Sequence, residues 1–386
     1  MTTRSSPLSL LATARAPLAA FAAMGIAWGS FAAELPDLKA MLDVDEARLG
    51  LLLLLTPAAA VVSMVLAPMI GHALGRMALP VAAICMGLAF ALPGQASVVW
   101  LFPLAMMCCG AATGLTDVLM NARVAALENE RGLHLMNLTH AAYSFGYAGG
   151  ALMTGAMRGA GWGPPAVMGT VALVAAGFAL LTFEADGRID GLQRPKGKGA
   201  GHLGLIPLFG GGIVLIAFLT ENAAENWSAL HIEQTLGGSP AEGAGGPAVI
   251  ALTMGVARLA GQGLAGRIGP FRLIAGGAVV SALGAVGAAL AQTPAMAYAG
   301  FMVMGLGSSV ISPTAFSLVG RLARPEARAR AVARATLLGY FGYFFGPPML
   351  GLIAGTFGLR YAFVFAAVML MTVLVLAPLM ARQQGR

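Results

Sequence analysis

The sequence predicts an all-α membrane protein whose twelve transmembrane helices form two six-helix halves. Of its 386 residues, 58% are hydrophobic and 10% are charged, and the mean hydropathy is +0.81. A chain with so few charged residues lacks the polar surface that a water-soluble globule needs. Apolar runs of about 20 residues, long enough to cross a bilayer, are centred near Met24, Val61, Cys85, Met106, Tyr147, Val174, Leu215, Leu252, Val279, Met304, Gly342 and Val368.

The first apolar run follows Arg4 and Arg15 and ends near Glu34. A cleaved signal peptide is the alternative interpretation of such a run. Because it contains Trp28 and several glycines and has a counterpart in the second half of the chain, we expect it to be retained as the first helix. The acidic segment 37–46 is then an outer loop.

The distribution of charge predicts the topology. The net charge is +7 and the pI is about 9.8, which in a soluble domain would suggest nucleic acid. If the N-terminus is cytoplasmic, however, 23 Lys and Arg residues divide so that the outer side keeps Lys39, Arg48, Arg158 and Arg360, and the cytoplasmic side holds the rest, including Arg258. This positive-inside bias predicts a multi-pass membrane protein with both termini in the cytoplasm.

The three cysteines do not suggest a metal site. Cys85, Cys108 and Cys109 lie within apolar runs and lack the spacing of metal ligands. We interpret them as small packing residues. We expect no metal and no cofactor.

An internal repeat organises the chain. Short patterns of the first half recur in the second at offsets of 191 to 196 residues. They pair Glu34 with Glu225, Gly75-Arg76 with Gly266-Arg267, Asp117 with Ser312, and the GxxxG pair Gly146 and Gly150 with Gly342 and Gly346. We therefore predict an N-terminal half at residues 1–183, a cytoplasmic linker at 184–201 and a C-terminal half at 202–386. Parallel repeats of this kind are typical of transporters that move two halves around a midplane site.

Motifs along the chain resemble the major facilitator superfamily. The turns at residues 71–76 and 261–269 resemble the family's signature after its second helix and the repeat of that signature. Gly75 and Gly266 stand where that signature has aspartate, which puts the family's aspartate-based gate latch in doubt. A closer resemblance, to the branch near the fucose/proton symporters, rests on Asp117-x-x-x-Asn121, Glu128, His140-x-x-x-Ser144-x-Gly146, Glu221-x-x-x-Glu225-Asn-Trp227 and the segment from Arg328 to Pro348. It implies the twelve-helix major facilitator fold, a location in the bacterial inner membrane, and transport of a sugar, vitamin or other small polar solute.

Asp117 and His140 are the candidate proton-coupling pair. Asp117 shares a helix face with Asn121, and His140 shares one with Ser144 on the next helix. Burial disfavours the charged form of each group and their proximity favours it, so either group can exchange a proton near neutral pH. Ionisable groups at membrane depth are functional by default. The alternative is a polar network that ties the fourth and fifth helices together.

Polar residues of the seventh helix are candidates for solute binding. Glu221, Asn222 and Glu225 are expected near its outer end, where two carboxylates one turn apart repel each other. A proton, a cation or a polar solute would compensate this repulsion. The alternative is an ordinary hydrated helix end.

The remaining substrate candidates are uncharged. Trp28 in the first helix can stack on a flat solute or simply pack. Ser312 is expected at the depth of Asp117 in the other half, and Tyr343 lies beside the glycines of a possible hinge. The predicted substrate-binding set is Trp28, Asn121, Ser144, Glu221, Asn222, Glu225, Ser312 and Tyr343.

Four charged residues near helix ends are candidate gating residues, namely Arg76, Glu128, Arg267 and Arg330. The arginines before the eleventh helix can close an inner gate against an acidic residue such as Glu128. Topology alone also explains a basic cytoplasmic loop.

Together these observations predict a secondary active transporter of a small polar organic solute that works by alternating access with proton symport. The sequence has no HExxH pair, P-loop or GxSxG turn, so we do not expect an enzyme. A proton-coupled exporter of drugs or metabolites is the alternative, and a membrane sensor that does not transport is the second. The expected partners are a small-molecule substrate, protons and the lipid bilayer, without nucleic acid, and we expect a monomer.

Overall fold

The computed structural model describes residues 11–133, 135–189, 204–260, 267–324 and 327–385, and these residues form helices without any strand. The first part of the chain holds α2 (Arg15–Leu42), α3 (Glu46–Leu52), α4 (Leu55–Leu74), η1 (Gly75–Met77), α5 (Ala78–Ala89), α6 (Leu92–Gln95), α7 (Leu101–Arg131), α8 (Met136–Gly159) and α9 (Pro164–Leu180). The second part holds α10 (Ile206–Leu230), η2 (His231–Thr235), α11 (Pro240–Ala260), α13 (Pro270–Leu290), α14 (Pro294–Ser308), α15 (Ile311–Leu322), α16 (Arg328–Phe357), α17 (Leu359–Ala381) and η4 (Arg382–Gly385).

Nine helical stretches among these residues are long and apolar enough to cross a membrane. One of them, Glu46–Gln95, contains both α4 and α5, and therefore supplies two crossings. With α8 and the shorter α9, the described part of the chain provides the twelve helices of the predicted fold. The chain is thus a multi-pass, all-helical membrane protein.

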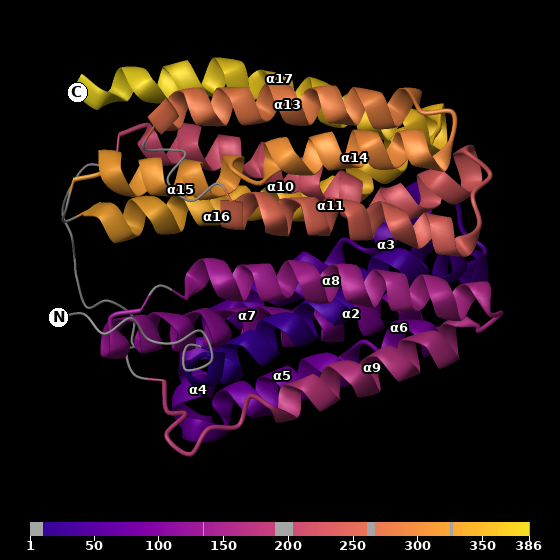
Figure 1. The fold of residues 1–386 in the computed structure, drawn as a ribbon, viewed down its shortest axis with the longest axis horizontal. Coiled ribbons are helices and arrows are strands. Elements are labelled where there is room, and N and C mark those ends of the chain that lie inside the picture. The colour runs from indigo at the N-terminus through magenta and orange to yellow at the C-terminus, as the bar shows by residue number, and fades with distance from the viewer. Residues whose placement is uncertain (1–10, 134, 190–203, 261–266, 325–326, 386) are drawn as a thin grey trace.

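The helices form two bundles that lie side by side (Figure 1). Helices α2 to α9 make one bundle and α10 to α17 make the other. The bundles meet on the side away from the chain termini, where α8 packs against α11 and α3 against α16, and they diverge toward the termini. Most of the predicted linker, 184–201, lies outside the described residues, and so does Gly266 of the repeated turn.

Small residues allow the central helices to approach closely. A Cβ added at Gly146 or Gly150 of α8 would collide with the backbone of Ala22 or Ile26 of α2. In the other bundle, a Cβ at Gly342 of α16 would collide with the backbone of α10. The contacts that the GxxxG spacing predicts in each half are therefore present.

The first helix is longer than predicted. We expected it to end near Glu34, but α2 continues through Pro36 to Leu42. Pro36 removes the backbone donor that would bond the carbonyl of Ala32, and the next carbonyl, that of Ala33, accepts a hydrogen bond of 2.8 Å from Arg158. The outer acidic segment therefore begins as helix and not as a loop.

Candidate functional site: a central cavity between the two bundles

A cavity of about 370 Å³ lies between the two bundles and is lined from both. This volume falls in the range of sites for small organic molecules. The N-terminal bundle contributes Phe21, Met24, Trp28, Phe31, Leu53, Thr56, Pro57, Ala60, Met64, Met106, Gly110, Thr113, Asp117, Met120, His140, Tyr143, Ser144 and Tyr147. The C-terminal bundle contributes Phe218, Glu221, Asn222, Glu225, Asn226, Ala251, Met254, Arg258, Tyr340, Tyr343 and Pro347.

The predicted coupling pair lies in this cavity. Asp117 lies in the middle of α7, His140 lies in the first two turns of α8, and both line the cavity. No hydrogen bond joins them within the described residues, and the ring of His140 packs edge-on against Phe21 at 5.0 Å between centroids. The structure thus places the two groups at one site, and their role in coupling stays a prediction.

Asn121 forms two hydrogen bonds with Asp117. Its side-chain amide donates to the backbone carbonyl of Asp117 at 2.9 Å and to the Oδ1 atom of Asp117 at 3.1 Å. Asn121 itself does not line the cavity. Its position fits a residue that orients the carboxylate and does not touch the solute.

The acidic residues of α10 lie deeper than we expected. Glu221, Asn222 and Glu225 were predicted near the outer end of their helix, but they face the same cavity as Asp117, and α10 continues to Leu230 before the π-helical turn η2. Counting residues from a helix start underestimated how far the helix extends. The carboxyl Oε1 of Glu221 and the carboxamide Oδ1 of Asn222 are buried without a hydrogen-bond partner.

Arg258 is a cavity residue that the sequence analysis missed. Its charge was assigned to the cytoplasmic side, yet its side chain is half-buried and lines the cavity from α11. It shares the lining of the cavity with His140, Glu221 and Glu225. The signal in the sequence was weak, because Arg258 lies only two residues before the end of α11 at Ala260.

Aromatic side chains form much of the cavity wall. The indole N–H of Trp28 donates to the Thr113 hydroxyl at 3.2 Å, and its ring packs edge-on against Phe90. Tyr343 stacks on Phe218 with 4.6 Å between centroids. Both roles proposed for Trp28 are therefore sterically available, since it packs on one side and lines the cavity on the other.

The other predicted residues lie elsewhere. Ser144 lines the cavity, whereas Ser312 is buried outside its lining with a hydroxyl that has no partner. Glu128 accepts hydrogen bonds from the backbone N–H groups of Leu135 and Met136 at the start of α8. The predicted gating residues Arg76, Arg267 and Arg330 also lie away from the cavity, in η1, before α13 and in the first turn of α16.

A group of charged residues joins the bundles on the side away from the termini. Arg158 of α8 is fully buried and donates to the carboxylates of Asp37 at 2.7 and 2.8 Å and of Glu233 at 2.7 and 2.9 Å. Glu34 lies 3.9 Å from the same guanidinium. We call these four residues the Arg158 cluster. Because Glu233 belongs to the C-terminal bundle, the cluster closes this side of the cavity with charge-assisted bonds.

The fold and the site define a class of protein. Two six-helix bundles around one central cavity, closed on one side by a polar contact between the bundles, are the architecture of a secondary transporter. Comparisons with known proteins identify the family.

The sequence model of the protein family described as the Major Facilitator Superfamily matches residues 211–384. An uncharacterized MFS-type transporter of Yersinia pestis is 30% identical over 363 residues, which cover 92% of each chain. Membrane protein MosC of Rhizobium meliloti is 27% identical over 348 residues, covering 88% of this chain and 83% of the relative. The chain belongs to the major facilitator superfamily and is a transport protein, not an enzyme.

Solved structures share the fold at low identity. A bacterial homologue of the human lysosomal transporter Spinster, in an inward-facing and unoccupied conformation, superposes with a TM-score of 0.75 at 15% identity, covering 98% of both chains. The nucleoside transporter NupG gives 0.73 at 14% identity, covering 96% of this chain and 98% of that one. A D-xylose-proton symporter gives 0.72 at 14% identity, covering 96% and 97%.

Proposed function

We propose that this protein takes up a small polar organic solute, such as a sugar or a vitamin, together with protons across the bacterial inner membrane. The observation that carries the proposal is the cavity itself, which holds Asp117 and His140 from one bundle opposite Glu221, Asn222 and Glu225 from the other. A group that changes protonation next to the solute site links the binding of the two. The resemblance to fucose/proton symporters supports uptake as the direction.

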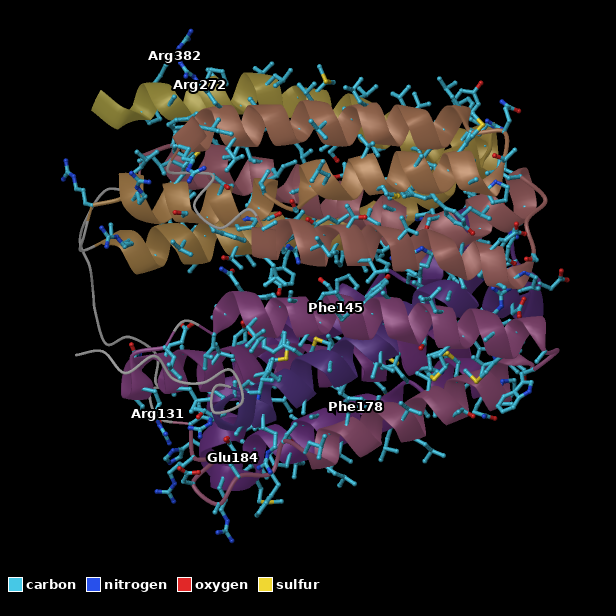
Figure 2. All side chains as sticks on the ribbon, in the orientation of Figure 1. Arg131, Phe145, Phe178, Glu184, Arg272 and Arg382 are labelled. Carbon is cyan, nitrogen blue, oxygen red and sulfur yellow. The ribbon has the colours of Figure 1, made fainter. Side chains whose placement is uncertain are left out.

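Alternating access follows from the contacts between the bundles. With both termini in the cytoplasm, the Arg158 cluster closes the outer side, and the divergence of the bundles in Figure 1 faces the cytoplasm. Figure 2 supports this orientation, since Arg131, Arg272 and Arg382 all lie at the end of the molecule where the termini are. Opening to the outside requires the Arg158–Glu233 contact to break.

The proposal is tested in two steps. A thermal-shift screen of the purified protein against sugars, nucleosides, flavins and other vitamins identifies a solute that stabilises it, because a ligand that binds the native state raises the unfolding midpoint. Flux of that solute into proteoliposomes is then measured with and without a pH gradient. Accumulation that needs the gradient supports symport, and binding without flux would indicate a sensor.

An exporter that exchanges solute for protons is the second candidate. The lining of the cavity supports an exporter, because most of the lining is apolar and aromatic, as in Phe21, Met24, Phe31 and Met254. The direction of the pH change during flux separates the two mechanisms.

A further inference from the structure

The cavity contains more negative than positive groups. Asp117, Glu221 and Glu225 are carboxylates, and His140 and Arg258 are the basic residues of the lining. Glu221 is 5% exposed and its Oε1 atom has no hydrogen-bond partner. Buried acceptors in native proteins are almost always paired. Glu221 therefore has one carboxylate oxygen without a partner at the wall of the cavity.

Arg258 does not complete this site. It lines the same cavity as Glu221 and Glu225, yet in the described part of the chain no ion pair within 4.0 Å and no hydrogen bond joins it to either carboxylate. One guanidinium also leaves one of two carboxylates uncompensated when both are ionised. A proton on one carboxylate or a second cation beside the glutamate pair would balance the charge, and the aromatic lining suits the cation.

Three tyrosines share the cavity with the glutamate pair. Tyr143 and Tyr147 of α8 and Tyr343 of α16 all line it together with Glu221 and Glu225. None of their hydroxyls forms a hydrogen bond to Glu221 or Glu225 among the residues that the structure covers. Tyr343 is held in place by stacking on Phe218. Aromatic faces next to carboxylates are the chemistry that recognises organic ammonium groups.

The surroundings select an organic cation over a metal ion. Among the described residues, no group of three or more His, Cys, Asp and Glu side chains is placed to hold a metal. The rest of the lining includes thioether and aromatic groups, which suit an apolar body. A volume of about 370 Å³ admits a single small molecule of this kind.

We propose that the transported solute carries a protonated or quaternary amine on an apolar or aromatic body, and that Glu221 and Glu225 bind the amine between Tyr143, Tyr147 and Tyr343. This inference rests on the proposed function, because it names the solute class of the same cavity. It narrows the range of small polar solutes to those with a cationic nitrogen.

Three probes of nearly equal size and different charge test the inference. Phenethylamine is a cation at neutral pH, 2-phenylethanol is neutral and phenylacetate is an anion. Calorimetric titration of the purified protein at neutral pH should show phenethylamine binding at least about tenfold more tightly than 2-phenylethanol, a ratio equivalent to about 1.4 kcal/mol, with phenylacetate weakest. Equal affinities for the three probes, tighter binding of the neutral probe, or no binding of phenethylamine at millimolar concentration would overturn the inference.

Substitutions of the two glutamates test whether Glu221 and Glu225 cause the selectivity for the cationic probe. Glu221→Gln and Glu225→Gln should each weaken phenethylamine binding by about tenfold or more while changing 2-phenylethanol binding by less than about twofold, since the loss of charge affects the cation alone. Tyr343→Leu should weaken the cation more than the neutral probe. The matched control is Asp43→Asn, which removes an exposed carboxylate at a left-handed position that asparagine tolerates, and it should leave all affinities unchanged. Glutamate variants that bind phenethylamine like the wild type would contradict the assignment, and the wild-type comparison of probes stands even if a variant fails to fold.

Binding and flux, measured on the same protein, distinguish a failure of this inference from a failure of the proposed function. Cation-selective binding without proton-dependent flux in proteoliposomes would uphold the inference and overturn symport. Proton-dependent flux of a neutral solute, without selectivity for phenethylamine, would uphold symport and overturn the inference.

Discussion

Asp117 is the residue on which the proposed coupling depends. It lies in the middle of α7, lines the cavity and is oriented by Asn121 through a bond of 3.1 Å. A carboxylate at membrane depth costs roughly 2.5–3.5 kcal/mol on insertion scales. A residue that only ties two helices together would not need to face a cavity, so its position favours the exchange of protons.

The substitution Asp117→Asn removes the titratable group and keeps the size of the side chain. We expect it to abolish accumulation of solute driven by a pH gradient and to spare exchange of labelled for unlabelled solute, because exchange needs no net movement of protons. Uptake into proteoliposomes measures both. Asp43→Asn is the control with an exposed carboxylate, and unchanged accumulation in Asp117→Asn would remove the coupling role.

At the scale of elements, the contact between α8 and η2 joins the two bundles on the side where they meet. Arg158 is fully buried and joins Asp37 of α2 to Glu233 of η2. Removing one partner of a buried ion pair typically costs about 3–5 kcal/mol, and here Glu34 and Glu233 would stay largely buried whereas Asp37 is partly exposed. Much of that cost is relieved if this side opens and water reaches the carboxylates.

Arg158→Met should therefore shift the protein toward the outward-open state. A cysteine at position 244, where Ala244 packs against Gly155 across the two bundles, reports opening in a protein whose native cysteines are replaced. A membrane-impermeant maleimide should label it several-fold faster in Arg158→Met than in the same protein with Arg158. Arg360→Met is the matched control, because Arg360 donates to Ala289 within the C-terminal bundle. Equal labelling in all three proteins would exclude the Arg158 cluster as a gate.

The close contact of α2 and α8 is the second prediction at this scale. A methyl group at Gly29 would collide with the backbone of Tyr147, whereas one at Gly149 would meet nothing within 4 Å. Gly29→Ala should destabilise the protein by about 1–3 kcal/mol through overpacking, and Gly149→Ala should be neutral or slightly stabilising. The thermal unfolding midpoints of the two purified variants make the comparison. Indistinguishable midpoints would show that the helices separate without cost.

The periodicity of the sequence predicted the helices better than it predicted which side chains face each other. The repeat and the GxxxG pairs depend on local spacing, so the helices, their close contacts and the shared site of Asp117 and His140 followed from the sequence. Ser312 shows the limit, since it was expected in the site and lies outside the cavity lining. Spacing predicts depth along a helix, but the rotation of that helix is set by its neighbours.

Interactions between distant segments were the part that the sequence did not reveal. Arg158 and Glu233 are 75 residues apart, and Arg258 reaches the cavity from the last turns of α11. In each case a charge near a helix end was explained by topology, which is the usual reason for such a charge. Tertiary packing gave these residues a second role.

At the scale of the whole molecule, the proposed transport depends on both bundles and on the side where they meet. The cavity lies between bundles that close on the side of the Arg158 cluster and diverge toward the termini. In our account the proton binds to Asp117 and His140 of one bundle, and the charge of the solute is bound by Glu221 and Glu225 of the other bundle. Coupling then requires both bundles in the same protein.

The most direct test of this account measures the pH inside proteoliposomes while the stabilising solute is added outside. A pH-sensitive dye in the lumen reports which way protons move with the solute. Symport predicts that addition of the solute acidifies the lumen in the wild-type protein and not in Asp117→Asn. A lumen that turns alkaline, or flux of the solute without any change of pH, would contradict proton symport.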